Sequence, residues 1–125
     1  MILLLDAHAV LWWLADDRAL AEPARRSIAD PANDVLVSAA SVWEIGIKLA
    51  LGKVDAPDGL LEALEASGLT TIPITTADAE HAARLVPHHR DPFDRMLVAQ
   101  ASRLDAVVVT RDAAFGAYGV RVLAA

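Results

Sequence analysis

Short apolar runs alternate along the chain with longer segments in which apolar residues recur every three or four positions. The short runs are almost uniformly apolar, which is typical of strands buried on both faces of a sheet. The longer segments are typical of helices with one apolar face. The pattern therefore predicts strands at 2–6, 35–38, 69–74, 106–110 and 120–123, and Pro73 indicates an edge position for the third.

Six helices are predicted around these strands. Gly52 and Gly68 follow two of them and provide natural C-terminal ends. Residues 31–34 (PAND) form a turn, and residues 113–119 form a short helix or turn. The predicted helices cover 7–15, 18–30, 38–52, 58–68, 76–85 (with a Thr or Asp cap) and 91–104.

This order of elements predicts an α/β fold with a central, mainly parallel sheet and helices on both faces. The length of 125 residues and the hydrophobic content of 55% fit a single domain, 1–125. Ligands of such sheets bind beyond the carboxyl ends of the strands. Polar residues that follow strands are therefore the first candidates for a functional site.

Composition narrows the classes of protein. The absence of cysteine excludes disulfides, zinc–thiolate sites and cysteine nucleophiles. The apolar opening MILLLDAHAVLWWLADD contains Asp6 and has no basic leader, so we expect neither a signal peptide nor a membrane span. We therefore expect a cytoplasmic protein.

The formal net charge of −6 argues against a basic nucleic-acid-binding protein. If four of the 17 acids formed one metal site, however, 13 would remain against 11 Lys and Arg residues, a balance of only −2. An acidic protein can still cut nucleic acid when a metal ion, and not lysine, meets the phosphate.

Four acids are the candidate ligands. Asp6 ends the first apolar run and Asp112 follows the fourth, so both should emerge at the same edge of a parallel sheet. Glu44 lies on the helix after the second strand, and Asp94 begins the helix before the fourth. Clustered carboxylates repel one another unless a cation is present, and oxygen ligands suit Mg²⁺ or Mn²⁺. Such a site favours phosphodiester hydrolysis over peptide or ester hydrolysis.

Asp94 should point inward, because Leu97, Val98 and Ala101 follow it at +3, +4 and +7 on one apolar stripe. An inward carboxylate needs a partner. A metal ion is one possible partner, and Arg95 and Arg111 are others. The structural alternative is that the carboxylate only meets the positive end of the helix dipole. We interpret Asp91 as the N-cap of this helix and do not expect it to matter for catalysis.

Each of the other candidate ligands has an alternative structural explanation. Asp6 and Asp112 could cap the helical segments that follow them. Glu44 could form a surface ion pair with Lys48 at +4. Arg111 could hold a phosphate or simply balance charge, and it is a candidate substrate-binding residue.

Other polar and aromatic residues are assigned with the same alternatives open. Ser41 could support a ligand or the substrate, but helix capping explains either Ser38 or Ser41 equally well. The four histidines have no metal-ligand spacing, and we interpret the neighbours His88 and His89 as part of a solvated loop. The histidines are His8, His81, His88 and His89.

Trp12 and Trp13 are adjacent in the first predicted helix and point about 100° apart. At least one of them should therefore lie at an interface.

Four segments in order resemble the PIN-domain ribonucleases, in particular the VapC toxins of type II toxin–antitoxin pairs. They are LLLDAHAVLWWL (3–14), SAASVWEIGIK (38–48), HHRDPFDRMLVAQA (88–101) and VVTRDAAFGAYGVRVL (108–123). Ala7 departs from the pattern, since relatives commonly have Thr or Ser there. The missing hydroxyl affects what supports the site and not the ligands themselves.

The resemblance implies a three-layer α/β/α domain that cleaves RNA as a metal-dependent endonuclease. It also implies that an acidic quartet holds one or two Mg²⁺ or Mn²⁺ ions, and that a VapB-type antitoxin wraps the toxin and can direct a basic side chain at the acids. Toxins of this family often form dimers, so a homodimer or a hetero-oligomer with antitoxin is expected. By motif, the quartet is Asp6, Glu44, Asp94 and Asp112.

Two other functions remain open at this point. One is a catalytically silent PIN-fold domain that serves interaction or regulation, and the other is a metal-dependent nuclease or phosphatase with another substrate. The sequence leaves open which RNA would be cut.

Overall fold

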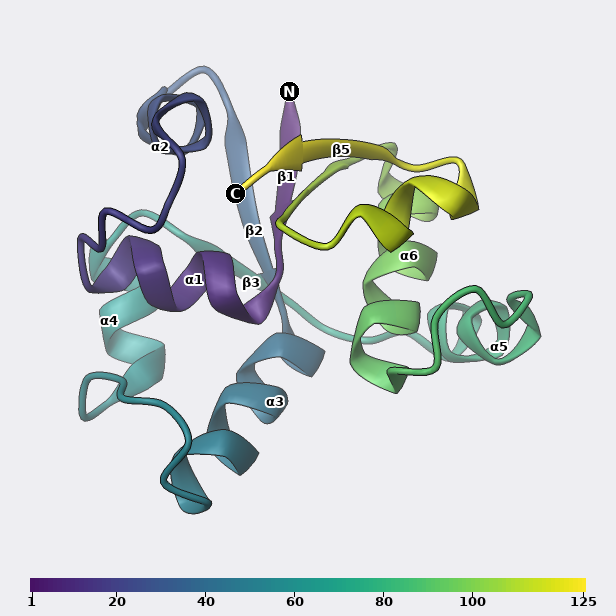
Figure 1. The fold of residues 1–125 in the computed structure, drawn as a ribbon, viewed down its shortest axis with the longest axis horizontal. Coiled ribbons are helices and arrows are strands. Elements are labelled where there is room, and N and C mark those ends of the chain that lie inside the picture. The colour runs from purple at the N-terminus through teal and green to yellow at the C-terminus, as the bar shows by residue number, and fades with distance from the viewer.

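The computed structural model describes residues 1–125, which form five strands, six α-helices and a 3₁₀ helix (Figure 1). The strands are β1 (Ile2–Leu5), β2 (Asp34–Ser38), β3 (Thr70–Ile72), β4 (Val107–Thr110) and β5 (Arg121–Ala124). The helices are α1 (Ala7–Leu14), α2 (Glu22–Ala29), α3 (Ala39–Ala50), α4 (Leu60–Ala66), α5 (Thr76–Arg84), α6 (Pro92–Leu104) and the 3₁₀ helix η1 (Ala113–Tyr118).

All five strands are parallel and lie in the order β3-β2-β1-β4-β5, so the predicted α/β fold is confirmed. Leu5, at the end of β1, is level with Val37 on β2 and Val109 on β4. The three central strands therefore end together. The chain runs from β1 outward through β2 to β3 and then crosses to β4 and β5 on the other side of β1. The strand order therefore reverses at β1, which is where parallel sheets open a binding crevice.

Helices cover both faces of the sheet, as Figure 1 shows with α1, α2 and α4 on one side and α5 and α6 on the other. Successive strand residues point to opposite faces. Leu3 and Leu5 of β1 accordingly join a core with α1, α2 and α4, and Leu4 joins a second core with α6 and η1. This arrangement is the expected three-layer α/β/α domain.

Several predicted boundaries differ from the structure for local reasons. The helix expected at 18–30 begins only at Glu22, and a proline in its first turn fixes that start. The third strand stops at Ile72, directly before Pro73, and lies at the sheet edge as predicted. Gly52, just beyond α3, has a φ of +68°, a conformation that glycine adopts readily. No helix is long and apolar enough to cross a membrane.

A buried ion pair joins α5 to α6. Asp78 is 1% exposed and forms a reciprocal capping box with Thr75 at the start of α5. Its two carboxylate oxygens accept from Arg103 of α6 at 2.7 and 3.0 Å. Because of these bonds the pKa of Asp78 is lowered from 3.8 to about 2. The pair fixes the last turn of α6 against the first turn of α5.

Candidate active site

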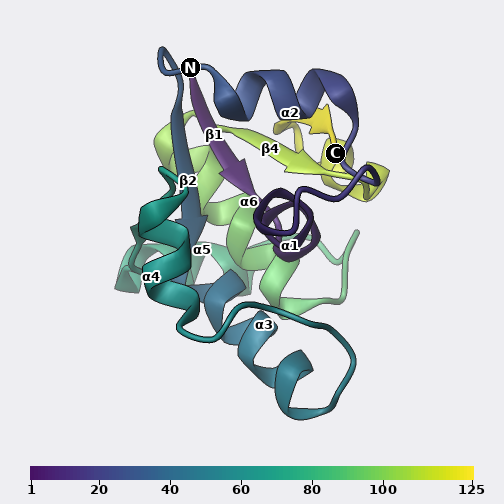
Figure 2. The same ribbon diagram turned by 90° about the vertical axis from the view of Figure 1, so that its left-hand side faces the viewer.

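The four predicted acids meet at the carboxyl ends of the central strands. Asp6 directly follows β1, and its backbone N–H donates to the carbonyl of Val109 on β4 at 3.1 Å. Figure 2 shows α1 nearly end-on beside the arrowhead of β1, so the chain turns sharply at Asp6. An open cavity of about 460 Å³ lies at this edge. Five carboxylates line it, from Asp6, Glu44, Asp91, Asp94 and Asp112, together with the cations Lys48 and Arg111.

Three of these acids are also helix N-caps. Asp6 caps α1, Asp91 caps α6 and Asp112 caps η1, in each case through Oδ1, which accepts from first-turn backbone N–H groups. The shortest of these bonds measure 2.9, 2.8 and 2.9 Å respectively. Oδ2 of each carboxylate is not used by the helix. Capping and metal ligation are therefore compatible in one residue, and the two explanations offered for Asp6 and Asp112 do not exclude each other.

Asp91 is the N-cap of α6, as predicted, but its carboxylate also lines the cavity. Sequence spacing gave no sign of this, because the wall of the cavity comes from several elements. Its lack of importance for catalysis stays a prediction.

Asp94 lies at the start of α6 and its side chain is only 18% exposed, in line with the expected inward orientation. Burial is the largest influence on its pKa. The negative charges of Asp91, Glu44 and Asp6 act in the same direction, against the attraction of His89, and together they raise the pKa of Asp94 to about 7. The site therefore has more negative charge than its own cations balance, which is the condition that a divalent cation relieves.

Glu44 forms the ion pair that its spacing to Lys48 suggested, with Nζ 2.7 Å from Oε2. The pair does not lie on the outer surface. Glu44 is 8% exposed, and both residues line the cavity. The structural and functional explanations of Glu44 therefore describe the same location.

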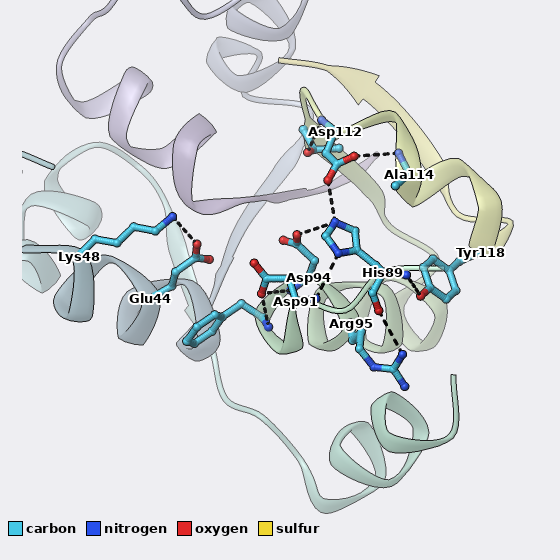
Figure 3. Close-up of polar contacts among 11 residues, drawn as sticks. Glu44, Lys48, His89, Asp91, Asp94, Arg95, Asp112, Ala114 and Tyr118 are labelled. Atoms are coloured by element: carbon cyan, nitrogen blue, oxygen red, sulfur yellow. Dashed lines mark hydrogen bonds and ion pairs between the residues drawn. The ribbon is translucent and has the colours of Figure 1, made fainter. Parts of the chain in front are cut away.

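His89 belongs to the site, and its assignment to a solvated loop is wrong (Figure 3). Its Nε2 lies 2.7 Å from Oδ2 of Asp112 and 2.9 Å from Oδ2 of Asp94. Burial lowers the pKa of His89, but the bond to Asp112 and the surrounding negative charges outweigh it, so the pKa lies above its ordinary 6.5. The adjacent His88 is exposed, as expected.

The pKa of Asp112 is lowered, first by the backbone N–H of Ala114 and then by His89. The pKa values of Asp112 and Asp94 are thus shifted in opposite directions within one site. Asp112 keeps its charge readily, whereas Asp94 holds a proton until near neutrality.

Arg111 lines the cavity, but its guanidinium is already engaged. It donates to the backbone carbonyls of Ala19 and Ala125 and lies over the ring of Trp12, 4.2 Å from the ring centroid. These contacts connect the α1–α2 link to the end of β5. They give Arg111 a structural role that neither predicted alternative included.

Ser38 is the N-cap of α3, where its Oγ accepts from the N–H of Ala40 at 3.0 Å. Ser41 lies inside the helix, is 1% exposed and has an Oγ without a hydrogen-bond partner. It does not line the cavity. Trp12 and Trp13 are both half-buried, and Trp43 is the exposed tryptophan at 65%, with its ring edge-on to Phe93.

The donor set fits a hard divalent cation. The cavity offers carboxylate oxygens and no sulfur, which suits Mg²⁺ or Mn²⁺. One ligand atom each of His89, Asp94 and Asp112 lies within 4.8 Å of the others. Asp6, Glu44, Asp94 and Asp112 are the residues that would hold the ion.

Comparison with known proteins gave a family match and several structural neighbours. The PIN domain family model matches residues 3–120. The fold is similar to VapBC2 from Rickettsia felis bound to a promoter DNA fragment (TM-score 0.69, 15% identity, 99% of this chain and 98% of that chain). It is also similar to FitAcB from Neisseria gonorrhoeae, with a TM-score of 0.61, 24% identity and coverage of 99% of this chain and 97% of that chain. A further similar structure is VapBC-1 from nontypeable Haemophilus influenzae, with a TM-score of 0.63, 16% identity and coverage of 98% of this chain and 97% of that chain. No curated protein matched in sequence.

Proposed function

Because the chain belongs to the PIN domain family, we propose that it is a metal-dependent endoribonuclease and the toxin of a type II toxin–antitoxin pair. The observation that carries the proposal is the meeting of five carboxylates at one strand edge, where the pKa of Asp94 is raised to about 7. Such a charge excess is unfavourable in the free protein and favourable around a divalent cation.

The residues that line the cavity have different proposed roles. Asp6, Glu44, Asp94 and Asp112 hold one or two Mg²⁺ or Mn²⁺ ions. A bound ion of this kind polarises a phosphoryl oxygen and lowers the pKa of the attacking water. Lys48 brings a positive charge to the cavity wall beside Glu44 and is placed to attract an RNA phosphate when metal takes up the carboxylate. Arg111 lines the cavity while backbone carbonyls hold its guanidinium, whereas Ser41 has no hydrogen-bond partner and does not line the cavity.

The proposed partner is a VapB-type antitoxin, and the domain is expected as a homodimer or as a hetero-oligomer with it. The VapBC and FitAB complexes among the structural neighbours support this assignment. Trp43, Ile47 and Leu51 follow one another at four-residue intervals along α3 and its C-cap, and all three are exposed. An exposed apolar stripe of this kind is typical of a protein-binding surface.

Cleavage of labelled total RNA tests the proposal. The wild-type protein should give discrete fragments with Mg²⁺ or Mn²⁺ and none with chelator, and Asp94→Asn should give none while remaining folded. Persistent cleavage in chelator would refute the metal-dependent mechanism. Intact RNA with every metal, from a protein that binds no Mn²⁺, would favour the catalytically silent interaction domain.

A further inference from the structure

His89 contacts three acids of the cavity although it is not one of the predicted ligands. Its Nε2 donates to Oδ2 of Asp112 at 2.7 Å and lies 2.9 Å from Oδ2 of Asp94. The backbone N–H of Asp91 donates to its Nδ1 at 3.3 Å. Both ring nitrogens are therefore used within the site, as Figure 3 shows.

The ring is held firmly by its surroundings. The backbone N–H of His89 donates to Oη of Tyr118 at 2.8 Å, and that hydroxyl donates to the carbonyl of Val86 at 2.8 Å. Arg95 donates to the carbonyl of His89 at 3.3 Å, and the ring packs edge-on against Phe115 with centroids 5.9 Å apart. The side chain is only 18% exposed. Backbone and ring are thus fixed together.

The partner of Nε2 decides what this nitrogen can do. A carboxylate can only accept a hydrogen bond, so Nε2 donates to Asp112 whether the ring is neutral or charged. While Nε2 carries this hydrogen, it has no lone pair for a metal ion.

We propose that His89 is a positioning residue, whose Nε2–H holds the Asp112 carboxylate beside Asp94 in the arrangement that a divalent cation requires. The inference rests on the proposed metal site. In an octahedral shell with bonds of roughly 2.1 Å, ligand atoms lie about 3 to 4 Å apart. One atom each of His89, Asp94 and Asp112 already lies within 4.8 Å of the others, so the two carboxylates that His89 joins have oxygens close to this separation.

Asp112 has particular need of such a contact. Its side chain is 45% exposed and begins the 3₁₀ helix η1, whereas Asp94 is 18% exposed and belongs to α6. Besides His89, the one hydrogen-bond donor to the Asp112 carboxylate is the backbone N–H of Ala114, which reaches its other oxygen. Without His89, the carboxylate would have more rotational freedom to lose when it binds metal.

Titration of the free protein with Mn²⁺, followed by calorimetry, tests the proposal. His89→Leu should weaken Mn²⁺ binding about 10- to 100-fold, as loss of an outer hydrogen-bond partner does at other metal sites. His89→Gln should restore most of the affinity, because its amide N–H can reach a similar position. The matched control His81→Leu changes an exposed histidine of α5 and should bind like the wild type. Thermal unfolding in chelator shows that each variant is folded.

Two results would overturn the proposal. Equal Mn²⁺ affinity in His89→Leu and wild type would show that the contact does not organise the ligands. Coupling of an imidazole nitrogen to Mn²⁺ in pulsed electron paramagnetic resonance, absent in His89→Leu, would make His89 a direct ligand. Failure of the proposed function itself looks different, because the wild type would then bind no Mn²⁺ and no variant would differ from it.

Discussion

Replacing Asp94 with asparagine should stabilise the metal-free protein at pH 8, although the change removes a candidate ligand. Burial and neighbouring carboxylates raise the pKa of Asp94 from 3.8 to about 7. A carboxyl with a higher pKa in the folded state binds its proton more tightly there. The folded protein therefore loses stability as the pH rises from about 4 to about 7, and the loss is complete above that range.

The magnitude follows from the distance between the two pKa values. About three pH units, at roughly 1.36 kcal/mol each, correspond to about 4 kcal/mol. Asp94 is 18% exposed, so water screens part of this upper bound, and we expect Asp94→Asn to gain about 2 kcal/mol at pH 8. At pH 4 the folded wild type retains the proton, so the two proteins should have nearly equal stability.

Urea unfolding in chelator, followed by circular dichroism at pH 4 and pH 8, measures this difference. Asp58→Asn is the matched control, because Asp58 is exposed and does not line the cavity. Added Mn²⁺ should reverse the order, since it binds and stabilises only the folded wild type. A variant no more stable than wild type at pH 8, or one equally stabilised at pH 4, would refute the reasoning.

Three further predictions concern the cavity and the α5–α6 contact. Asp91→Ser should keep most RNA cleavage, because serine also caps helices; an inactive variant would show that the Asp91 carboxylate itself is required. Calorimetric Mn²⁺ affinity should rise nearly tenfold per pH unit from pH 5 to about 7 and then level off, because Asp94 must release its proton; a flat profile would contradict the raised pKa. Arg103→Leu should lower the free energy of unfolding in urea, because Asp78, which is 1% exposed, loses the guanidinium that pairs with it. The pKa of Asp78, about 2 instead of 3.8, means that the pair stabilises the wild type fully above pH 4 and progressively less as the pH falls through 2; similar losses in the variant at pH 7 and pH 2 would argue against it.

Chain order alone predicted the edge at which Asp6 and Asp112 meet, because parallel strands end on the same side. Helical spacing predicted that Asp94 points inward, and its side chain is 18% exposed. Both deductions use only local periodicity and the shared direction of parallel strands. These are properties that the sequence carries within each element.

The missed residues depend on contacts between distant segments. His89 meets Asp112 across 23 positions, and Arg111 reaches Ala19 across 92. No periodicity links such pairs, since loops bring them together in the folded domain. Nothing in the sequence indicated that His89 is partly buried whereas the neighbouring His88 is exposed.

The division of the capping carboxylates has a consequence for how this domain can change. Asp6, Asp91 and Asp112 each give Oδ1 to a helix, and asparagine offers the same acceptor without the charge. By such a replacement at Asp6 or Asp112, a lineage could therefore lose the proposed metal site and still inherit a folded domain. Among related chains, the number of acids remaining at this edge should separate active from silent members better than similarity of fold does.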